Sequence, residues 1–319
     1  YLWLESDDHV ISCFDKQQEK YLSIQWNDEI KQNDILKLYS TGNTLYTILT
    51  DGLYMLNVKS DGKIIQLHKK ALIPNKKFYQ VITGQDQTLY LIDEDNQLII
   101  YHTENEKSDL IDCNQWGIQT KDVKNIYIAN NYLFACGDFD GIICFNLKDK
   151  VFRNIRILCN EYDYKQPNIQ EICHIKDNSF AISNMRFLYE MTFEGENYIK
   201  DKAEITRKVQ YERQFEKLIR NRITKLHYDS DNEVLWIGTY GNGLVRINNS
   251  QTYASQINLP DEIFHINNIV QDANGYIWLG TSKHGILKST DTELTPETTF
   301  EFWKHADKDE SKQKKKDMN

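Results

Sequence analysis

The sequence contains no apolar run that approaches the roughly 18–20 residues of a membrane-spanning helix, and no signal peptide is visible. It also lacks CxxC and Cys/His zinc spacings, a nucleophile elbow, a P-loop and a dinucleotide fingerprint. Arginine is sparse, with no triplet spaced as the chemistry of sialidases requires. A net charge of −9 argues against nucleic-acid contact by this segment. We therefore expect no metal and no cofactor, and catalysis is disfavoured.

The six cysteines are scattered along the chain, at positions 13, 113, 136, 144, 159 and 173. Most are expected to be buried and to act as small apolar residues. Cys136 and Cys144 flank the turn at 138–141 and are expected to lie on neighbouring strands. They are either free thiols or a cross-strand disulfide, and the sequence leaves both open.

One phrase of the sequence occurs twice. Val-Leu-Trp-Ile-Gly-Thr at 234–239 returns as Tyr-Ile-Trp-Leu-Gly-Thr at 276–281, and a turn containing glycine and a second apolar stretch follow each copy. The offset between Trp236 and Trp278 is 42 residues. A period of roughly 40–50 residues with several short strands per unit is typical of the blades of a β-propeller.

Weaker copies of the phrase occur upstream, each with an aromatic residue inside an apolar run. We call these aromatic residues anchors, and they are Trp3, Tyr46, Tyr90, Phe134, Phe180, Trp236 and Trp278. The successive spacings are 43, 44, 44, 46, 56 and 42 residues. The near-constant period predicts seven units of one kind.

Each unit reads as a meander of four antiparallel strands, with the anchor in the second strand. The turns carry Asn, Asp, Gly and Ser, which bend the chain by side-chain bonds or by tolerating positive φ. The fourth strand is more polar, as at 63–68, and is expected to form a charged outer edge. The sequence therefore predicts an all-β, seven-bladed propeller over 1–305 and a charged linker or tail over 306–319.

Two features interrupt the pattern. The chain opens at Tyr1 directly on a second strand and without an initiator methionine, so we expect a piece of a larger protein. The missing first strand would come from preceding residues or from the tail, although 299–303 fits better as the outer strand of the last blade. The long interval before Trp236 predicts an insertion at about 195–220, either a solvated loop or an arm that contacts a partner.

The two close copies resemble a known repeat. Leu-Trp-Ile-Gly-Thr-x-Gly-x-Gly-Leu at 235–244, with the strand at 222–229 before it, is similar to the two-component regulator propeller repeat, and so is 266–281. The resemblance covers about 220–290 closely and the rest only by spacing. It implies the periplasmic sensor of an inner-membrane-anchored hybrid two-component system with a histidine kinase. It also implies a second propeller, a stalk and a homodimer.

Two carboxylate motifs in the sequence bear on whether the segment is an enzyme or a binding module. Asp272-Ala-Asn-Gly-Tyr-Ile-Trp278 approaches the sialidase Asp-box turn, but its Asp lies three residues before Gly rather than two. Asp138 and Asp140 are a candidate pair of carboxylates for glycoside hydrolysis, although Asp in a turn more often forms the turn. We therefore expect a segment that binds and does not catalyse.

Sugar binding needs an apolar platform and a few planar polar groups. The turns between second and third strands and the connections between blades share one face of a propeller, and the candidates lie there. The candidate platforms are Trp26, Trp116 and Tyr240, and the candidate polar contacts are Asn114, Arg186, Asn242, Lys283 and His284. A tryptophan in a loop is alternatively a plug that packs beneath its own loop.

Other residues of the repeat are assigned to structure. Trp3, Trp236 and Trp278 are expected in the core between blades, and Gly238, Gly241, Gly243 and Gly280 at special backbone positions or close approaches. The functional hypothesis is a sensor that binds an oligosaccharide and controls polysaccharide-utilisation genes, as the resemblance implies. The alternative is a non-catalytic scaffold for protein interactions.

Overall fold

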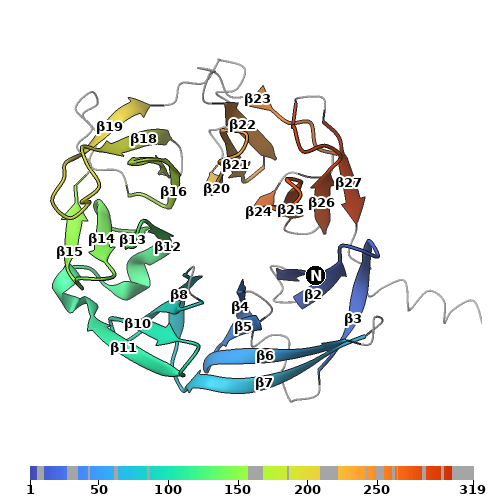
Figure 1. Cartoon of the computed structure of the whole chain (residues 1–319), viewed down its shortest axis with the longest axis horizontal. Coiled ribbons are helices and arrows are strands. Elements are labelled where there is room, and N and C mark those ends of the chain that lie inside the picture. Colours follow the sequence, from blue (N-terminus) through green and yellow to red (C-terminus); the bar gives the residue numbers. More distant parts are fainter. Residues whose placement is uncertain are drawn as a thin grey trace, which may run out of the picture.

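The computed structural model of the chain describes residues 1–5, 11–26, 35–41, 44–60, 64–84, 87–156, 168–184, 187–208, 222–241, 243–248, 255–260, 263, 265–281, 285–295 and 298–303. These residues form antiparallel sheets arranged in a ring around a common centre (Figure 1). The described part contains two short 3-10 helices, η2 (Cys113–Trp116) and η3 (Thr120–Asp122), and no helix in it could cross a membrane. The predicted all-β propeller architecture is confirmed.

Five of the sheets have four strands each and match the predicted unit. Their strands, in chain order, are β8 (Phe78–Thr83), β9 (Leu89–Asp93), β10 (Gln97–His102) and β11 (Lys107–Asp112); β12 (Val123–Ala129), β13 (Tyr132–Gly137), β14 (Ile142–Asn146) and β15 (Phe152–Ile155); β16 (Glu171–Lys176), β17 (Ser179–Ser183), β18 (Leu188–Phe193) and β19 (Ala203–Lys208); β20 (Ile223–Asp229), β21 (Val234–Thr239), β22 (Leu244–Asn248) and β23 (Ser255–Gln256); and β24 (Ile266–Gln271), β25 (Ile277–Thr281), β26 (Ile286–Ser289) and β27 (Phe300–Trp303). Within each sheet the first strand lies nearest the centre (Figure 1).

The sixth sheet has seven strands, so the described part does not show seven separate blades. Its strands are β1 (Leu2–Glu5), β2 (Ile11–Asp15), β3 (Lys20–Trp26), β4 (Ile35–Thr41), β5 (Thr44–Leu49), β6 (Gly52–Ser60) and β7 (Ile64–Pro74), in the order β1-β2-β3-β7-β6-β5-β4. The junction is a parallel pairing of β3 with β7, in which Ile24 lies opposite Ile65.

This junction corrects the expectation that the strand at 63–68 is a free, charged outer edge. β7 pairs with β6 on one side and with β3 on the other. Ile65 and Leu67 alternate with polar residues along β7, and both are fully buried. A neighbouring strand that covers an apolar face of this kind stabilises the folded chain. The edge is therefore paired instead of exposed to solvent.

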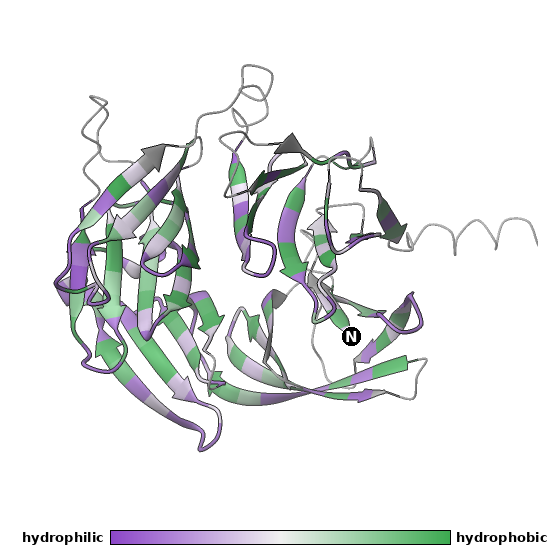
Figure 2. Cartoon of the chain, turned by 45° about the horizontal axis from the view of Figure 1, so that its top comes forward, coloured by the Kyte–Doolittle hydropathy of each residue, from purple (hydrophilic) through white to green (hydrophobic). Residues whose placement is uncertain are grey.

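The hydrophobic core lies between neighbouring groups of strands. The described residues form seven hydrophobic clusters, each made by two groups that are adjacent around the ring. All residues of β9, β13 and β21 are buried, as predicted for strands packed on both faces. Figure 2 shows hydrophobic residues concentrated along the strands and hydrophilic residues in the turns.

Five of the innermost strands, β4, β8, β12, β20 and β24, have a β-bulge near their first residues, whereas the irregularity of β16 lies near its end. The ladder shifts by one residue at Ile35/Lys37, Phe78/Gln80, Val123/Asn125, Ile223/Lys225 and Ile266/Asn268. A bulge places two residues opposite one, so apolar residues recur three apart here instead of two. In β12, β20 and β24 the two residues between them are polar.

The anchor tryptophans are buried as predicted, with exposed fractions of 1% for Trp236 and 3% for Trp278. Trp3 packs more loosely, against the cluster between β1–β3 and β4–β7. Gly238 is a close approach, because a Cβ there would lie 3.2 Å from Thr224 Oγ1. Gly280 has only ordinary contacts at the same position of the next repeat.

The two anchor tryptophans differ in one hydrogen bond. Trp278 Nε1 donates to Asp272 Oδ2 at 2.8 Å, whereas Trp236 Nε1 is buried with no hydrogen-bond partner. The turn before Trp236 is one residue longer, and Asp229 Oδ2 accepts instead from Asn232 and from Gln271 of the next sheet. Burial alone would raise the pKa of Asp272. The hydrogen bonds that Asp272 accepts, chiefly that from Trp278 and then those from the backbone of Asn274 and Tyr276, bring this pKa below its usual value.

This difference predicts unequal effects of one substitution. Trp278→Phe should lower the free energy of unfolding by about 1–2 kcal/mol more than Trp236→Phe, because only the first removes a bond to a carboxylate. Urea denaturation of both variants measures the difference. Equal losses would mean that the indole–carboxylate bond of Trp278 does not form in solution.

The remaining structural expectations concern the strand ends and the thiols. β27 pairs with β26, so 299–303 supplies the outer strand of the last sheet as expected. β19 pairs with β18, so the start of the presumed insertion belongs to a sheet, while 209–221 and the tail from 304 lie outside the described residues. Cys136 and Cys144 are free and buried, as are the other described cysteines, and burial raises the pKa of Cys144 to about 12.

Candidate functional site

The candidate site lies at the end of the ring where the inner strands begin. We call this end the loop face: it holds the turns between second and third strands and the segments that precede the inner strands. In each of three sheets, one backbone hydrogen bond joins the turn to the segment before the inner strand. These bonds run from Glu94 N to Lys77 O (3.1 Å), from Asp138 N to Asp122 O (2.8 Å) and from Tyr240 N to Arg222 O (2.8 Å). Each bond therefore sets two displayed residues side by side, near the centre of the ring.

Tyr240 presents an aromatic surface on the loop face. Its side chain is 57% exposed, and its ring stacks on His265 with a centroid distance of 3.9 Å and an interplanar angle of 20°. An isolated β-bridge also joins the two residues. Backbone pairing and stacking together hold the Tyr240 ring, which suits a platform for a flat ligand.

A tight turn positions Tyr240. Thr239 N and Oγ1 both bond to Gly243 O, at 3.1 and 2.8 Å, and Gly243 has a φ of +68° that a side chain would strain. The next repeat has the same turn, with Thr281 N and Oγ1 bonded to Gly285 O at 3.2 and 2.9 Å. Thr and Gly thus build the same turn in both repeats, and the residue between them that follows Thr takes no side-chain part in it.

An ion pair joins the neighbouring inner strands β16 and β20. Lys225 Nζ lies 3.6 Å from Glu171 Oε2, and this carboxylate is only 13% exposed. Burial raises the pKa of Glu171, and the nearby Lys225 ammonium opposes this rise. Thr224 Oγ1 donates to Ile266 O at 2.7 Å and links the two inner strands on either side of Tyr240.

His227 follows on the same inner strand and provides a pH-dependent prediction. Burial lowers its pKa, as does Lys225 to a smaller extent, while Asp229 opposes the change, and Nε2 is buried with no partner. The unfolded chain then binds the proton more tightly than the folded one, so stability falls as pH drops below about 6.5. His227→Gln should lose less unfolding free energy than the wild type between about pH 7.5 and 5.5. Urea titrations at both pH values measure this, and parallel losses would contradict it.

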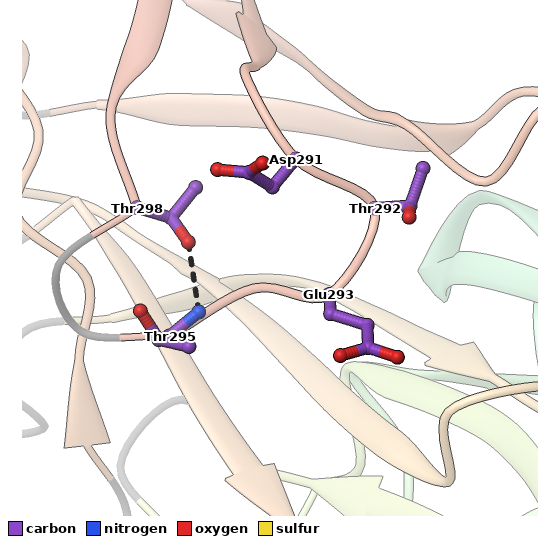
Figure 3. Close-up of a pocket in the computed structure, with 5 residues that line it drawn as sticks. All are labelled: Asp291, Thr292, Glu293, Thr295 and Thr298. Carbon is purple, nitrogen blue, oxygen red and sulfur yellow. Dashed lines mark hydrogen bonds between the residues drawn. The ribbon is translucent and has the colours of Figure 1, made fainter.

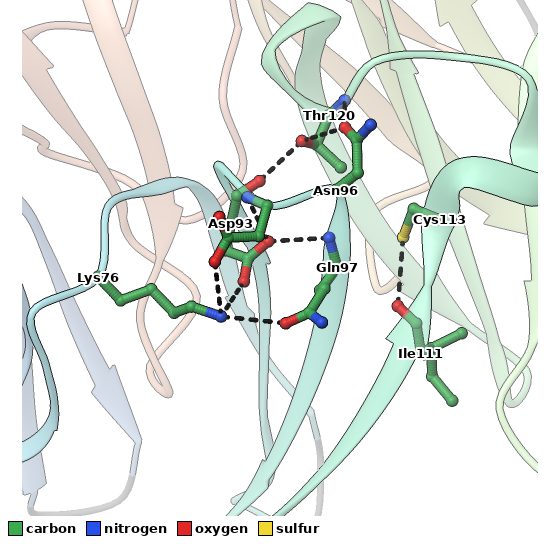
Figure 4. A network of polar contacts seen from close by, with 8 residues as sticks. Lys76, Asp93, Asn96, Gln97, Ile111, Cys113 and Thr120 are labelled. Carbon is green, nitrogen blue, oxygen red and sulfur yellow. Dashed lines mark hydrogen bonds and ion pairs between the residues drawn. The ribbon is translucent and has the colours of Figure 1, made fainter.

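A second part of the loop face is fixed by a polar network (Figure 4). Asn96 Oδ1 accepts from Thr120 N and Oγ1, both at 2.9 Å, and Asn96 Nδ2 donates to Asn114 Oδ1 at 2.9 Å. Buried Asp93 meets Lys76 Nζ at 2.5 Å. Asn114 is exposed, but its amide is already engaged with Asn96 and Asp112, which favours a structural role.

Trp116 is the plug of its loop and not a platform. Its side chain is 3% exposed and packs against Phe145 and Phe152, with ring centroids 6.0 and 6.4 Å away. The loop is held by a cap from Asp112 and ends at Gly117 in the left-handed conformation, which turns the indole inwards. The tryptophan therefore presents no face to a ligand.

Most of the other predicted site residues lie wholly or partly outside the described part of the chain. Trp26 ends β3, with its backbone opposite Leu67, and its side chain lies outside the described part. The predicted contacts Arg186, Asn242, Lys283 and His284 also lie outside the described residues. His265 and Arg222 were missed from sequence. Both directly precede an inner strand, and this position would have identified them.

The candidate pair Asp138 and Asp140 does not form a carboxylate dyad with free oxygens. Asp138 Oδ2 lies 3.2 Å from Lys124 Nζ, and Oδ1 accepts from Gln170 Nε2 at 3.1 Å. Asp138 therefore links β12 to the residue that precedes β16. No cluster of three or more His, Cys, Asp or Glu side chains suited to a metal occurs among the described residues.

An open depression of about 540 Å³ lies at the opposite end of the ring, between β26 and β27 (Figure 3). It is lined by Asp291, Thr292, Glu293, Thr295 and Thr298. Thr298 Oγ1 accepts from Thr295 N at 2.8 Å, which closes the turn itself. With no aromatic platform, this depression fits a flat ligand less well than the loop face.

Two segments, 217–241 and 258–283, match the model of the two-component regulator propeller repeat. These two segments are two-component regulator propeller repeats. The matched segments contain Tyr240, Arg222 and His265, so these repeats build the aromatic part of the loop face. The match is to a regulatory repeat and not to an enzyme, in agreement with the prediction of a segment that does not catalyse. A comparison with curated proteins finds no match.

Several solved structures share the fold at low sequence identity. The extracellular domain of the hybrid two-component system BT4673 from B. thetaiotaomicron is 17% identical, with a TM-score of 0.59 over 86% of this chain and 33% of that one. That of BT3049 from the same organism is also 17% identical, with a TM-score of 0.58 over 86% and 35%. The chain thus spans about a third of these structures. The β-propeller domain of Cps50 (Swd1) from Myceliophteria thermophila is 12% identical, with a TM-score of 0.52 over 78% and 74%.

Proposed function

We propose that this chain is the extracytoplasmic sensing propeller of a hybrid two-component system and that it binds an oligosaccharide on its loop face. The exposed, stacked Tyr240 carries the proposal, because a fixed aromatic ring without a role in the core suits a sugar platform. The regulator repeat and the likeness to extracellular domains of such systems support the sensing role. In this role ligand binding changes the population of two states of the parent protein.

The wider parts of the proposal follow from the parent architecture. We infer a periplasmic segment of an inner-membrane-anchored protein, joined to a second propeller and a stalk, in a homodimer whose histidine kinase controls polysaccharide-utilisation genes. We also count seven blades, by dividing the seven-stranded sheet at the parallel junction of β3 with β7. The seven interfacial hydrophobic clusters favour this count.

A thermal-shift screen of the chain against neutral and charged oligosaccharides tests the sensing role. A ligand at about 100 times its Kd should add roughly 2.7 kcal/mol to the free energy of unfolding and raise Tm visibly. Tyr240→Ala should abolish the shift while the unliganded Tm stays near that of the wild type, because an exposed side chain contributes little to stability.

Two results would contradict the proposal. A well-folded chain that no oligosaccharide stabilises would remove the sugar-binding role, and a stable protein complex that survives gel filtration without sugar would favour an interaction scaffold. A sugar that stabilises wild type and Tyr240→Ala equally would place the ligand elsewhere on the propeller.

A further inference from the structure

The part of the loop face around Tyr240 has chemistry that narrows the ligand class. We call Arg222, Tyr240 and His265 the aromatic sector. Arg222 and His265 directly precede β20 and β24, whose labels lie near the centre of the ring (Figure 1), and Tyr240 is joined to both residues by a backbone hydrogen bond or bridge. This inference rests on the proposed saccharide-binding function and deepens it.

Tyr240 is not a residue that the repeat needs. It stands four residues after the anchor Trp236, and the fold fixes this position by backbone bonds alone. The same position of the six other units holds Asp7, Thr50, Glu94, Asp138, Asn184 and Ser282. An aromatic ring occurs at one of these positions only, where it is mostly exposed, so its presence points to a ligand and not to the core.

Arg222 supplies a positive charge beside this platform. Its carbonyl accepts the hydrogen bond of Tyr240 N at 2.8 Å, and its side chain is exposed. Among the described residues no carboxylate lies within ion-pair distance of its guanidinium. The nearby Lys225 is already paired with Glu171, so Arg222 is the cation of this sector that is available to a ligand.

The equivalent positions of other sheets show that a cation here is not required by the fold, because Asp122 precedes β12 as Arg222 precedes β20, and its carbonyl accepts from Asp138 N. Lys77 precedes β8 as Arg222 precedes β20, and its carbonyl accepts from Glu94 N. Its ammonium lies 5.6 Å from the centroid of the Tyr79 ring, and the displayed partner beside it is acidic. Lys77 therefore sits in a different local setting, although its formal charge is the same.

We propose that the saccharide bound at the aromatic sector carries an anionic group, a carboxylate or a sulfate, that Arg222 binds while a sugar ring lies on Tyr240. A guanidinium offers two parallel N–H donors to such a group, which lysine cannot do, and the bond is charge-assisted. The ring of Tyr240 and the guanidinium are displayed from adjacent backbone positions. One acidic sugar residue is therefore small enough to contact both.

Calorimetric titration of the chain with matched oligosaccharides tests this selectivity. The probes are a neutral, a uronate-containing and a sulfated oligosaccharide of the same length, and the variants are Arg222→Gln, Tyr240→Ala and Lys77→Gln. We expect an anionic probe to bind wild type roughly 10- to 100-fold more tightly than the neutral one, the range of one charge-assisted bond. Arg222→Gln should remove that preference, and Lys77→Gln should keep it although it removes the same charge.

The outcomes separate this inference from the proposed function. Equal binding of neutral and anionic probes that Tyr240→Ala abolishes would overturn the anionic class and leave saccharide sensing intact. Equal losses in Arg222→Gln and Lys77→Gln would mean that net charge, not the sector, sets the preference. Binding of no probe to the folded chain would overturn both. The uronate and sulfate arms decide which anionic group is read.

Discussion

Replacing Trp236 with alanine should lower the free energy of unfolding by about 3–5 kcal/mol, the usual loss when a large core aromatic is truncated. The indole is 1% exposed and packs between β20–β23 and β24–β27, in the cluster that includes Ile263, Ile266 and Leu279. The cavity left behind is bounded by backbone of two sheets that cannot move together easily, so little of the loss should be recovered. Urea denaturation followed by intrinsic fluorescence measures it.

Tyr240→Ala is the matched control, because it removes an aromatic side chain four residues further on that is 57% exposed. Its effect should stay within about 0.5 kcal/mol, as for most surface substitutions. A loss below about 1 kcal/mol for Trp236→Ala would mean that Trp236 does not fill the interface between these sheets in solution, and the register of the repeat would have to be revised.

Asp93→Ala should also lower the free energy of unfolding by about 3–5 kcal/mol, because it removes a fully buried carboxylate, leaves two backbone N–H groups without their acceptor and takes from the partly buried Lys76 its closest counter-ion. Asp93 is fully buried, and its Oδ1 accepts from the backbone N–H of Asp95 and Gln97 at 3.0 and 2.8 Å. Its Oδ2 lies 2.5 Å from Lys76 Nζ (Figure 4). Burial lowers the pKa of Lys76, but the carboxylates of Asp93 and Asp95 outweigh it and raise that pKa overall.

Asp95→Ala provides the comparison for this site. Its carboxylate meets the same ammonium at 3.3 Å, but its side chain is 63% exposed. An exposed ion pair of this kind contributes about 0–1 kcal/mol. Chemical denaturation of both variants should therefore separate them clearly. Similar small losses at the two positions would mean that the buried pair is hydrated in solution.

The sequence predicted the parts of the fold that depend on local residue order. The two tryptophan phrases placed β21 and β25 and identified the buried anchors, because an aromatic residue in an apolar strand is specified by its own neighbours. Turn residues such as Asp229 and Asp272 were placed for the same reason, since each carboxylate caps backbone N–H groups two to four residues away.

Features that depend on contacts far apart in the chain were not predicted. The parallel pairing of β3 with β7 joins residues about 40 positions apart, and each strand alone reads as an ordinary outer strand. Trp116 faced inwards because its loop is closed by Asp112 and Gly117, a geometry that composition does not give. His265 was passed over since only the bridge to Tyr240 makes it part of a platform.

The strands β1–β3 contact their two neighbours around the ring through different kinds of interaction. On one side β3 and β7 share a ladder of backbone hydrogen bonds. On the other, the described contacts with β24–β27 are made by side chains: Phe14 and Trp278 both lie against Trp303, with centroids 5.2 and 6.0 Å away, and Tyr21 Oη donates to Trp303 O at 3.3 Å. Aromatic contacts release their partners without breaking a strand ladder. Native-state hydrogen exchange should therefore find amides along the interface of β1–β3 with β24–β27 opening before those along β3 and β7.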